Sequence, residues 1–271
     1  MESGSDSYNN MFSLQGKSII VTGGAGYLGR TMVQALLAFG AEVSVADRVE
    51  YPVAPDSAEG KAKLHSLICD LELSASIRQM FAQASEISGK IDVLVNCAAY
   101  GGGSGGKGIG GDLSLFTDEI WEKGIDGTLG VTFRCIREAL PYFYANKGGN
   151  IINIASMYGL VSPNPGLYGT SGQNSPPTYG AGKAGVLQLT RYCAANLAAR
   201  SIRVNCLTPG SFANPQGNLT DDFRARLNAS NMLGRVGRPE ELTGALVLLA
   251  SDASSYMTGS NIVIDGGWTA W

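Results

Sequence analysis

The sequence predicts an α/β fold: one doubly wound parallel sheet of about seven strands, with helices on both faces. The first observation behind this prediction is that short apolar runs alternate with longer runs of helical spacing. Strands separated by helices form right-handed crossovers and therefore a parallel sheet. The second observation is that glycine-rich segments follow strand ends, where open sheets of this kind carry their ligand crevice.

The expected strands are short apolar runs that lie at 18–22, 42–46, 64–69, 91–95, 150–154, 203–207 and 261–265. Apolar residues at helical spacing predict helices at 27–39, 74–87, 117–145, 178–200 and 239–250. No charged linker, internal repeat or long Pro/Ser tract separates two units. We therefore expect one domain over residues 14–271, preceded by a flexible tail over residues 1–13.

The composition excludes several classes of protein. Hydrophobic residues make up 44% of the chain and charged residues 16%, which favours a large buried core over disorder. The net charge of −3 offers no basic surface to a nucleic acid or an anionic membrane. With His65 as the single histidine and no C-x-x-C pair among five cysteines, we expect free thiols and no metal site. The start of the chain lacks a signal-peptide pattern, so we expect a cytoplasmic protein without a membrane partner.

A glycine-rich turn follows the first expected strand and leads directly into a helix. Glycines 23, 26 and 29 form a G-x-x-G-x-x-G pattern. Such a turn lets a pyrophosphate approach the N–H groups at a helix N-terminus. Asp47 ends the second expected strand, where a carboxylate binds both ribose hydroxyls and repels a 2′-phosphate. The pattern predicts a Rossmann-type site that favours NAD over NADP, although Arg48 could hold a phosphate.

Tyr179 and Lys183 begin a later helix, and residues four apart lie on one helix face. An ammonium beside a phenol favours the phenolate form. Such a tyrosine can take or give the proton of an alcohol while a hydride moves to or from a nicotinamide. By itself Y-x-x-x-K is a common surface pair, so it gains meaning only from the motifs around it.

Those motifs resemble the short-chain dehydrogenase/reductase family, in its compact single-domain branch, from about residue 14 to the C-terminus. The motifs that carry the resemblance are the glycine turn at 22–29, Asn96-Cys-Ala-Ala, Asn153-Ile-Ala-Ser156, Tyr179 with Lys183, and the segments 203–210 and 258–268. The resemblance implies that Ser156 hydrogen-bonds the substrate oxygen, that Tyr179 is the acid/base and that Lys183 holds the nicotinamide ribose.

The resemblance also implies a set of cofactor contacts. The expected cofactor-binding residues are Gly23, Gly26, Tyr27, Leu28, Asp47, Asp70, Leu71, Asn96, Ala98, Tyr179, Lys183, Pro209 and Gly210. Asp70 suits an adenine amino group, and an equally open alternative is that it caps a helix.

Two departures from the family affect the catalytic centre. Thr128 stands where the family normally has a catalytic Asn, so we expect a proton relay rearranged around a threonine hydroxyl. Glycines 124, 127 and 130 either loosen the helix around Thr128 or permit a close helix contact at a subunit interface.

Two further departures affect the cofactor. The glycine turn has Tyr27 after its middle glycine, which is more similar to the extended branch of the family. Ser211 or Asn214 stands where the family often places a Thr that holds the carboxamide.

Two loops, 100–112 and 162–178, are expected beside the substrate. The second makes Ser156 and Tyr179 about ten residues further apart than the family usually has. The expected substrate-binding residues are Ser156, Tyr158, Tyr168, Gln173 and Asn174. Neutral hydrogen-bonding groups with aromatic faces suit a polyhydroxylated ring. The leading interpretation is NAD-linked interconversion of a secondary alcohol and a ketone on a sugar, polyol or sugar derivative.

Two other functions stay open. A 3-oxoacyl-thioester reductase would dock an acidic carrier protein, for which Arg134, Arg137 and Arg191 are candidates. A non-catalytic NAD-binding regulator is favoured only by Thr128.

The resemblance implies a homotetramer or homodimer. The helices at 117–145 and 178–200 would pair at one interface, and Val263, Trp268 and Trp271 would pack at another. A plain core position is the alternative for the tryptophans, Trp121 above all.

Overall fold

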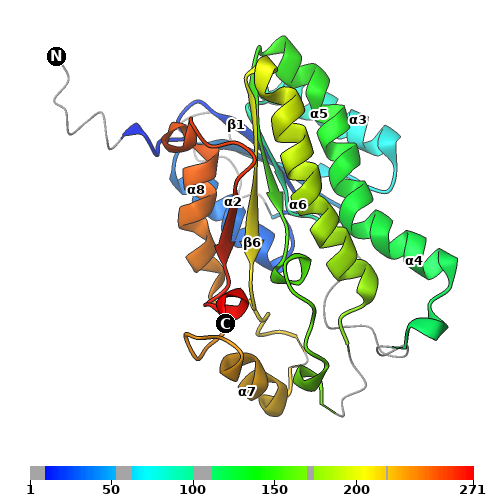
Figure 1. Ribbon diagram of the computed structural model, residues 1–271. Helices are drawn as coiled ribbons and strands as arrows, with labels where there is room; N and C mark the ends of the chain where they lie inside the picture. Colours follow the sequence, from blue (N-terminus) through cyan, green and yellow to red (C-terminus); the bar gives the residue numbers. More distant parts are fainter. Residues whose placement is uncertain (1–9, 53–62, 100–111, 170–173, 218) are drawn as a thin grey trace.

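A single parallel sheet organises the computed structural model, which describes residues 10–52, 63–99, 112–169, 174–217 and 219–271. Within these ranges the sheet has seven strands in the order β3-β2-β1-β4-β5-β6-β7 (Figure 1). The strands are β1 (Ser18–Thr22), β2 (Glu42–Asp47), β3 (Leu64–Ile68), β4 (Val93–Asn96), β5 (Gly149–Ile154), β6 (Ile202–Pro209) and β7 (Asn261–Ile264). The predicted doubly wound α/β fold is confirmed.

The strand order reverses between β1 and β4. The chain begins in the middle of the sheet, winds outward through β2 to β3, and then returns to the other side of β1. All residues of β1 and β4 are buried, because helices cover both faces of the sheet. At such a reversal the loops that follow the two strands diverge and leave a crevice at their carboxyl ends.

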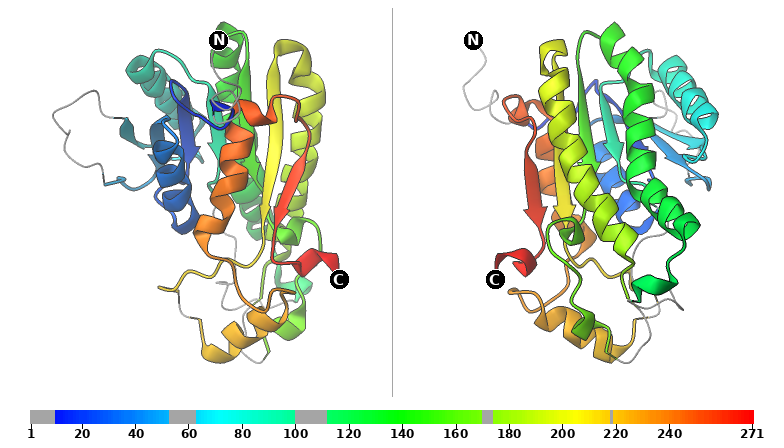
Figure 2. Two further views of the ribbon diagram at one scale, coloured as in Figure 1. Left: turned by 90° about the vertical axis from the view of Figure 1, so that its left-hand side faces the viewer. Right: turned by 45° about the vertical axis from the view of Figure 1, so that its right-hand side comes forward.

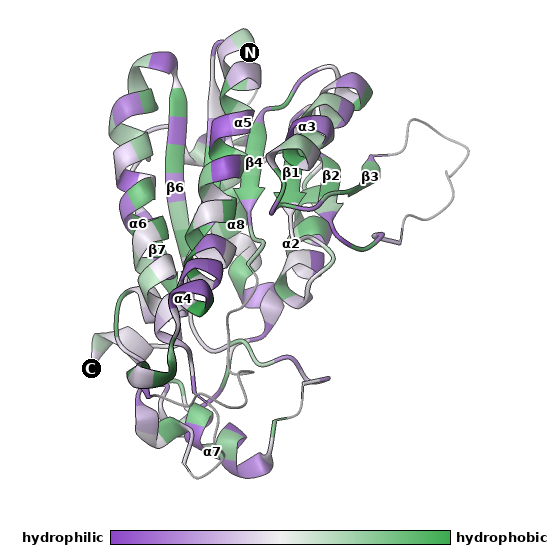
Figure 3. Cartoon of the chain, turned by 90° about the vertical axis from the view of Figure 1, so that its right-hand side faces the viewer, coloured by the Kyte–Doolittle hydropathy of each residue, from purple (hydrophilic) through white to green (hydrophobic). Residues whose placement is uncertain are grey.

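Two layers of helices enclose the sheet. Figure 2 shows α2 (Tyr27–Ala38) and α8 (Thr243–Ala250) on one face, and α3 (Ser74–Ser88), α5 (Val131–Ala145) and α6 (Pro177–Leu197) on the other. The strands are largely hydrophobic, whereas the outer sides of the helices carry most of the hydrophilic colour (Figure 3). This distribution places one apolar core on each face of the sheet.

The expected helix over 117–145 is divided. It consists of α4 (Asp118–Ile125), a π-helical turn (Asp126–Gly130) and α5. Gly127 and Gly130 lie in that turn, so the expectation of a loosened helix around Thr128 is confirmed.

The helix α7 (Asp221–Ala229) was not predicted. It lies beyond the carboxyl ends of the strands (Figure 1). Its start carries a recognisable signal, because the Thr220 hydroxyl accepts a hydrogen bond from the Phe223 N–H and two aspartates occupy the first turn.

Three other expectations need comment. Residues 1–9 of the expected tail lie outside the described residues, while the Met11 carbonyl accepts a hydrogen bond from the Ala253 N–H. The core alternative for Trp121 is wrong, because its side chain on α4 is 45% exposed. Trp268 is buried against its own chain, whereas Trp271 and Val263 are exposed.

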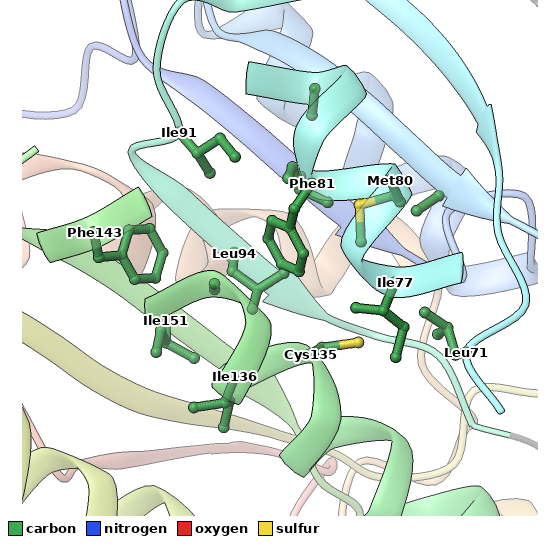
Figure 4. Close-up of a cluster of buried hydrophobic side chains, with 14 of the residues drawn as sticks. Leu71, Ile77, Met80, Phe81, Ile91, Leu94, Cys135, Ile136, Phe143 and Ile151 are labelled. Atoms are coloured by element: carbon green, nitrogen blue, oxygen red, sulfur yellow. The ribbon is translucent and has the colours of Figure 1, made fainter. Parts of the chain in front are cut away.

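The core between the sheet and the α3–α5 pair is close-packed. Phe81 of α3 is fully buried, and its ring lies 5.7 Å from that of Tyr142 on α5. Leu94 of β4 and Ile151 of β5 face the same cluster (Figure 4). On the other face, Met32 and Leu36 of α2 pack with Leu246 of α8. These two cores fix the strand ends that carry the functional residues.

We expect Phe81→Ala to lower the free energy of unfolding by about 3–5 kcal/mol, since it opens a cavity in a core that cannot collapse around it. The matched control is Phe39→Ala at an exposed site, which should cost less than about 1 kcal/mol. Urea unfolding followed by circular dichroism measures both. Equal effects of the two substitutions would contradict the assignment of Phe81 to the core.

Candidate active site

The glycine turn between β1 and α2 is a tight backbone cradle. Gly23 has φ +67°, and a Cβ there would lie 2.7 Å from the Ala98 Cα. A Cβ at Gly29 would lie 2.2 Å from the Gly23 carbonyl oxygen. The N-terminus of α2, after Gly26, has no side-chain cap, so its first N–H groups are available to an anion. A pyrophosphate fits this cradle, whereas side chains would fill it.

Asp47 lies beside the cradle, at the end of β2. Its carboxylate accepts hydrogen bonds from the Ala25 N–H at 3.0 Å and from the Arg48 N–H at 2.7 Å. Both bonds fix the carboxylate at the end of the cavity where a ribose would bind next to the glycine turn. Tyr27 reaches across the cavity from α2, and its hydroxyl donates to the Ala213 carbonyl at 3.1 Å.

Ser156 follows β5 and begins a short 3-10 turn (Met157–Gly159). Its Oγ accepts a hydrogen bond from the Tyr158 N–H at 3.2 Å. This bond orients the oxygen and leaves the hydroxyl proton for another acceptor. Ser156 is buried and lines the same cavity as the glycine turn.

Tyr179 and Lys183 lie one turn apart near the start of α6. The Lys183 Nζ lies 5.9 Å from the centre of the Tyr179 ring and donates to the Ile154 carbonyl at 2.7 Å. Lys183 is only 3% exposed, so its charge depends on partners inside the protein. Both side chains line the cavity.

Glycines bring the Ser156 turn against α6. A Cβ at Gly159 would lie 2.7 Å from the Lys183 carbonyl carbon, and one at Gly180 would lie 3.0 Å from the Tyr158 carbonyl oxygen. The backbones of the turn and the helix are therefore in direct contact. This contact joins Ser156 to Tyr179 despite the long segment between them in the sequence.

Thr128 lies in the interior of the protein, against α6. It is fully buried in the π-helical turn, and its hydroxyl donates to the carbonyl of Gly124, at 3.0 Å, or of Ile125, at 3.2 Å. Its side chain faces Gly182 of α6, where a Cβ would lie 1.7 Å from the Thr128 Oγ1. Thr128 is not among the residues that line the cavity. The structure thus gives its hydroxyl a partner within its own helix.

One cavity of about 680 Å³ gathers most of the predicted cofactor residues, a volume typical of ligand sites. The predicted residues that line it are Gly23, Gly26, Tyr27, Leu28, Asp47, Leu71, Ala98, Ser156, Tyr179, Lys183, Pro209 and Gly210. Asp70 and Asn96 are not among its lining residues. The Asn96 amide donates to the Asn153 Oδ1 at 2.9 Å, and its own oxygen is buried without a partner among the described residues.

The cavity wall also contains residues outside the predicted site list, and Cys97 and Phe212 are two examples. Each follows a predicted site residue closely in the sequence, which is the only signal that could have found them. Burial raises the pKa of the Cys97 thiol to about 11, with the Lys183 ammonium acting in the opposite direction. The thiol therefore stays protonated near neutral pH.

An aromatic cluster lies next to the catalytic turn. The Tyr168 ring stacks on Phe223 of α7 at 5.6 Å, and the Tyr158 ring meets Trp268 edge-on at 6.3 Å. The two tyrosine hydroxyls lie 3.4 Å apart. Burial, followed by the contact with Tyr168, raises the pKa of Tyr158, so its phenol stays neutral.

The segment before α6 is held by α7 as well. The Arg226 Nε donates to the Leu167 carbonyl at 2.6 Å. Asn174 lines a second hollow with Tyr158, outside the main cavity. Gln173 and the loop over 100–111 lie outside the described residues.

The described part of the chain contains no group of three or more His, Cys, Asp or Glu side chains arranged to hold a metal ion. In the same ranges, no helix is both long enough and apolar enough to cross a bilayer.

Comparison with known proteins identifies similar chains. The family model described as enoyl-(acyl carrier protein) reductase matches residues 24–269. A 3-oxoacyl-(acyl-carrier-protein) reductase from Thermotoga maritima is 33% identical over 260 residues, which cover 94% of this chain and 98% of the relative.

Two solved structures share the fold over nearly their whole length. A short-chain dehydrogenase from Leptospira borgpetersenii with bound NAD+ has a TM-score of 0.80 and 29% identity, covering 99% of this chain and 96% of that one. A gluconate 5-dehydrogenase from Burkholderia cenocepacia in complex with NADP and tartrate has a TM-score of 0.80 and 25% identity, covering 97% and 98%.

We expect Gly182→Ala to destabilise the protein by about 1–3 kcal/mol, because the new methyl group overlaps Thr128. Thr128→Ala in the same chain should recover part of the loss, since it removes the oxygen at the shortest distance. Gly244→Ala in α8 is the matched control, because a Cβ there meets no atom within 4 Å. Thermal unfolding compares the variants. A Gly182→Ala protein as stable as the control would refute the described contact.

Proposed function

The chain belongs to the short-chain dehydrogenase/reductase family, and from this premise we propose that it interconverts a secondary alcohol and a ketone with NAD as the hydride carrier. The observation that carries the proposal is that Ser156, Tyr179 and Lys183 line one cavity with the glycine turn and Pro209–Gly210. In this proposal, the acid/base group and the dinucleotide cradle share one crevice.

Ser156, Tyr179 and Lys183 have different roles in the proposed reaction. A bound nicotinamide supplies the hydride for reduction or accepts it in oxidation. In reduction, the Ser156 hydroxyl donates to the substrate carbonyl oxygen, and the Tyr179 phenol gives its proton to that oxygen as the alcohol forms. The Lys183 ammonium stabilises the negative charge left on the phenolate. In oxidation, the phenolate takes the alcohol proton instead.

The cofactor residues support NAD in preference to NADP. The glycine turn and the N-terminus of α2 would hold the pyrophosphate, and Asp47 would accept from both hydroxyls of the neighbouring ribose. A 2′-phosphate at that ribose would lie next to the Asp47 carboxylate. Asp70 for the adenine amino group, and Asn96 beside the nicotinamide end, belong to the same proposal.

We propose a sugar, polyol or sugar derivative as the substrate. Tyr158 lies beside the Ser156 turn and lines a hollow together with Asn174, and its neutral hydroxyl lies 3.4 Å from that of the buried Tyr168. Gln173 belongs to this proposal too. The similarity to the gluconate 5-dehydrogenase from Burkholderia cenocepacia supports a polyhydroxylated substrate.

The second candidate is reduction of a 3-oxoacyl thioester. It is favoured by the similarity to the carrier-protein reductase from Thermotoga maritima. The ion pairs of Arg134 with Asp126 and of Arg137 with Glu138 reduce the positive charge that these arginines would offer to an acidic carrier protein. A non-catalytic NAD-binding regulator would need Tyr179 to be dispensable.

We also propose a homotetramer or homodimer. Apolar side chains remain exposed on α4 and α5, at Ile120, Trp121 and Phe133, and at the C-terminal end, at Val263 and Trp271. Light scattering would measure the assembly directly.

We expect Tyr179→Phe to lower kcat by about 10²–10⁴-fold, because it removes the proton donor while keeping the ring. NADH binding, followed by its fluorescence, should persist in the variant. Tyr192→Phe is the matched control, since this tyrosine lies on the same helix with an exposed side chain, and it should leave turnover unchanged. The assay follows NADH absorbance with a panel of polyols, sugars and ketones. Turnover by the Tyr179→Phe protein near the wild-type rate would overturn the assignment.

A further inference from the structure

Arg48 is a cation at the ribose end of the cavity, directly after Asp47. Arginine binds phosphate through two parallel N–H donors on one edge of its guanidinium. A free arginine at this position would therefore attract the 2′-phosphate of NADP, against the effect of Asp47. The contacts of Arg48 therefore determine whether its positive charge or the negative charge of Asp47 has the larger effect on a 2′-phosphate.

The Nε–Nη2 edge of Arg48 is held by carboxylates. The Asp70 Oδ1 accepts from Nε at 3.2 Å and from Nη2 at 2.8 Å, and the Glu72 Oε1 accepts from the same Nη2. This is an edge that a phosphate would need. Asp70 and Glu72 bring two negative charges to the Arg48 guanidinium, and the Asp47 carboxylate adds a third at the Arg48 backbone N–H. Arg134 also acts on Asp70 but is itself paired with Asp126, so the charges of these residues sum to a negative value.

We propose that Glu72 is a specificity-determining residue for the cofactor: together with Asp70 it occupies the phosphate-binding edge of Arg48 and so excludes NADP. The inference rests on the proposed function, since it extends the NAD preference assigned to Asp47. Two effects would then disfavour NADP. The Asp47 carboxylate repels the 2′-phosphate, and the Asp70 and Glu72 carboxylates keep the Arg48 guanidinium from binding that phosphate.

Substitution of Glu72 tests the contact with Arg48 more cleanly than substitution of Asp70. The Asp70 carboxylate also accepts from the Glu72 N–H at 2.9 Å, so it shapes its own turn as well as binding Arg48. Asp70 is in addition a proposed adenine contact. The Glu72 carboxylate has neither role, and its replacement by Gln keeps the shape of the side chain.

The experiment measures the dissociation constants of NADH and NADPH by nucleotide fluorescence in the full-length protein. Glu72→Gln should tighten NADPH binding about fivefold, the size expected for one exposed ion pair, with NADH binding changed less than about twofold. Adding Arg48→Met to Glu72→Gln should remove that gain. Glu50→Gln, which deletes an exposed acid two residues after Arg48, is the matched control and should leave both constants unchanged.

Other outcomes overturn the inference. The proposed role of Glu72 is excluded if Glu72→Gln leaves the ratio of the NADPH and NADH dissociation constants as in the wild type. It is also excluded if Arg48→Met does not reverse the gain in NADPH affinity. An equal shift with Glu50→Gln would mean that bulk charge, not the contact with Arg48, sets the preference. A wild-type protein that binds neither nucleotide would instead refute the proposed function, and the inference would fall with it.

Discussion

The buried ammonium of Lys183 constrains the catalytic centre more than any other group. A charge removed from water is costly unless protein atoms replace the lost hydrogen bonds. The Ile154 carbonyl at the end of β5 supplies one of them, at 2.7 Å. The start of α6 is therefore tied to the end of β5, the strand that leads into Ser156. The hydrogen bond of Lys183 to the Ile154 carbonyl therefore links the segment that carries Ser156 to the helix that carries Tyr179.

Small residues bring these two segments into contact. Gly159 and Gly180 let the Ser156 turn and α6 meet backbone to backbone, and Gly182 makes room for Thr128. Both ends of the segment between Ser156 and Tyr179 are held by these contacts, so the additional residues of the segment lie away from them. It packs instead on α7, through Tyr168 against Phe223 and through Arg226. The residues of the proposed acid/base chemistry and those of the proposed substrate contact thus come from different parts of the chain.

The parts of this structure that local patterns encode were predictable. Alternating apolar runs predicted the strands, and the glycine turn, Asp47 and the Tyr179–Lys183 pair were found from residue type and spacing. Other features depend on a local change of helix type or on contacts between distant segments. The partner of the Thr128 hydroxyl follows from a π-helical turn, and the acids around Arg48 come from a turn more than twenty residues later. Neither can be read from spacing alone.

The two ends of the cavity differ in what holds them. At the cofactor end, Gly23, Asp47 and Ala98 sit at strand ends whose positions are set by the hydrogen-bond ladder of the sheet. Next to the Ser156 turn, Tyr168 and Trp268 are held by aromatic packing between segments that lie outside the sheet. Ladder contacts fix the backbone itself, whereas side-chain packing tolerates substitution of comparable volume. Under the proposed function, changes in the aromatic cluster would therefore alter substrate preference without displacing Lys183, Tyr179 or the glycine turn.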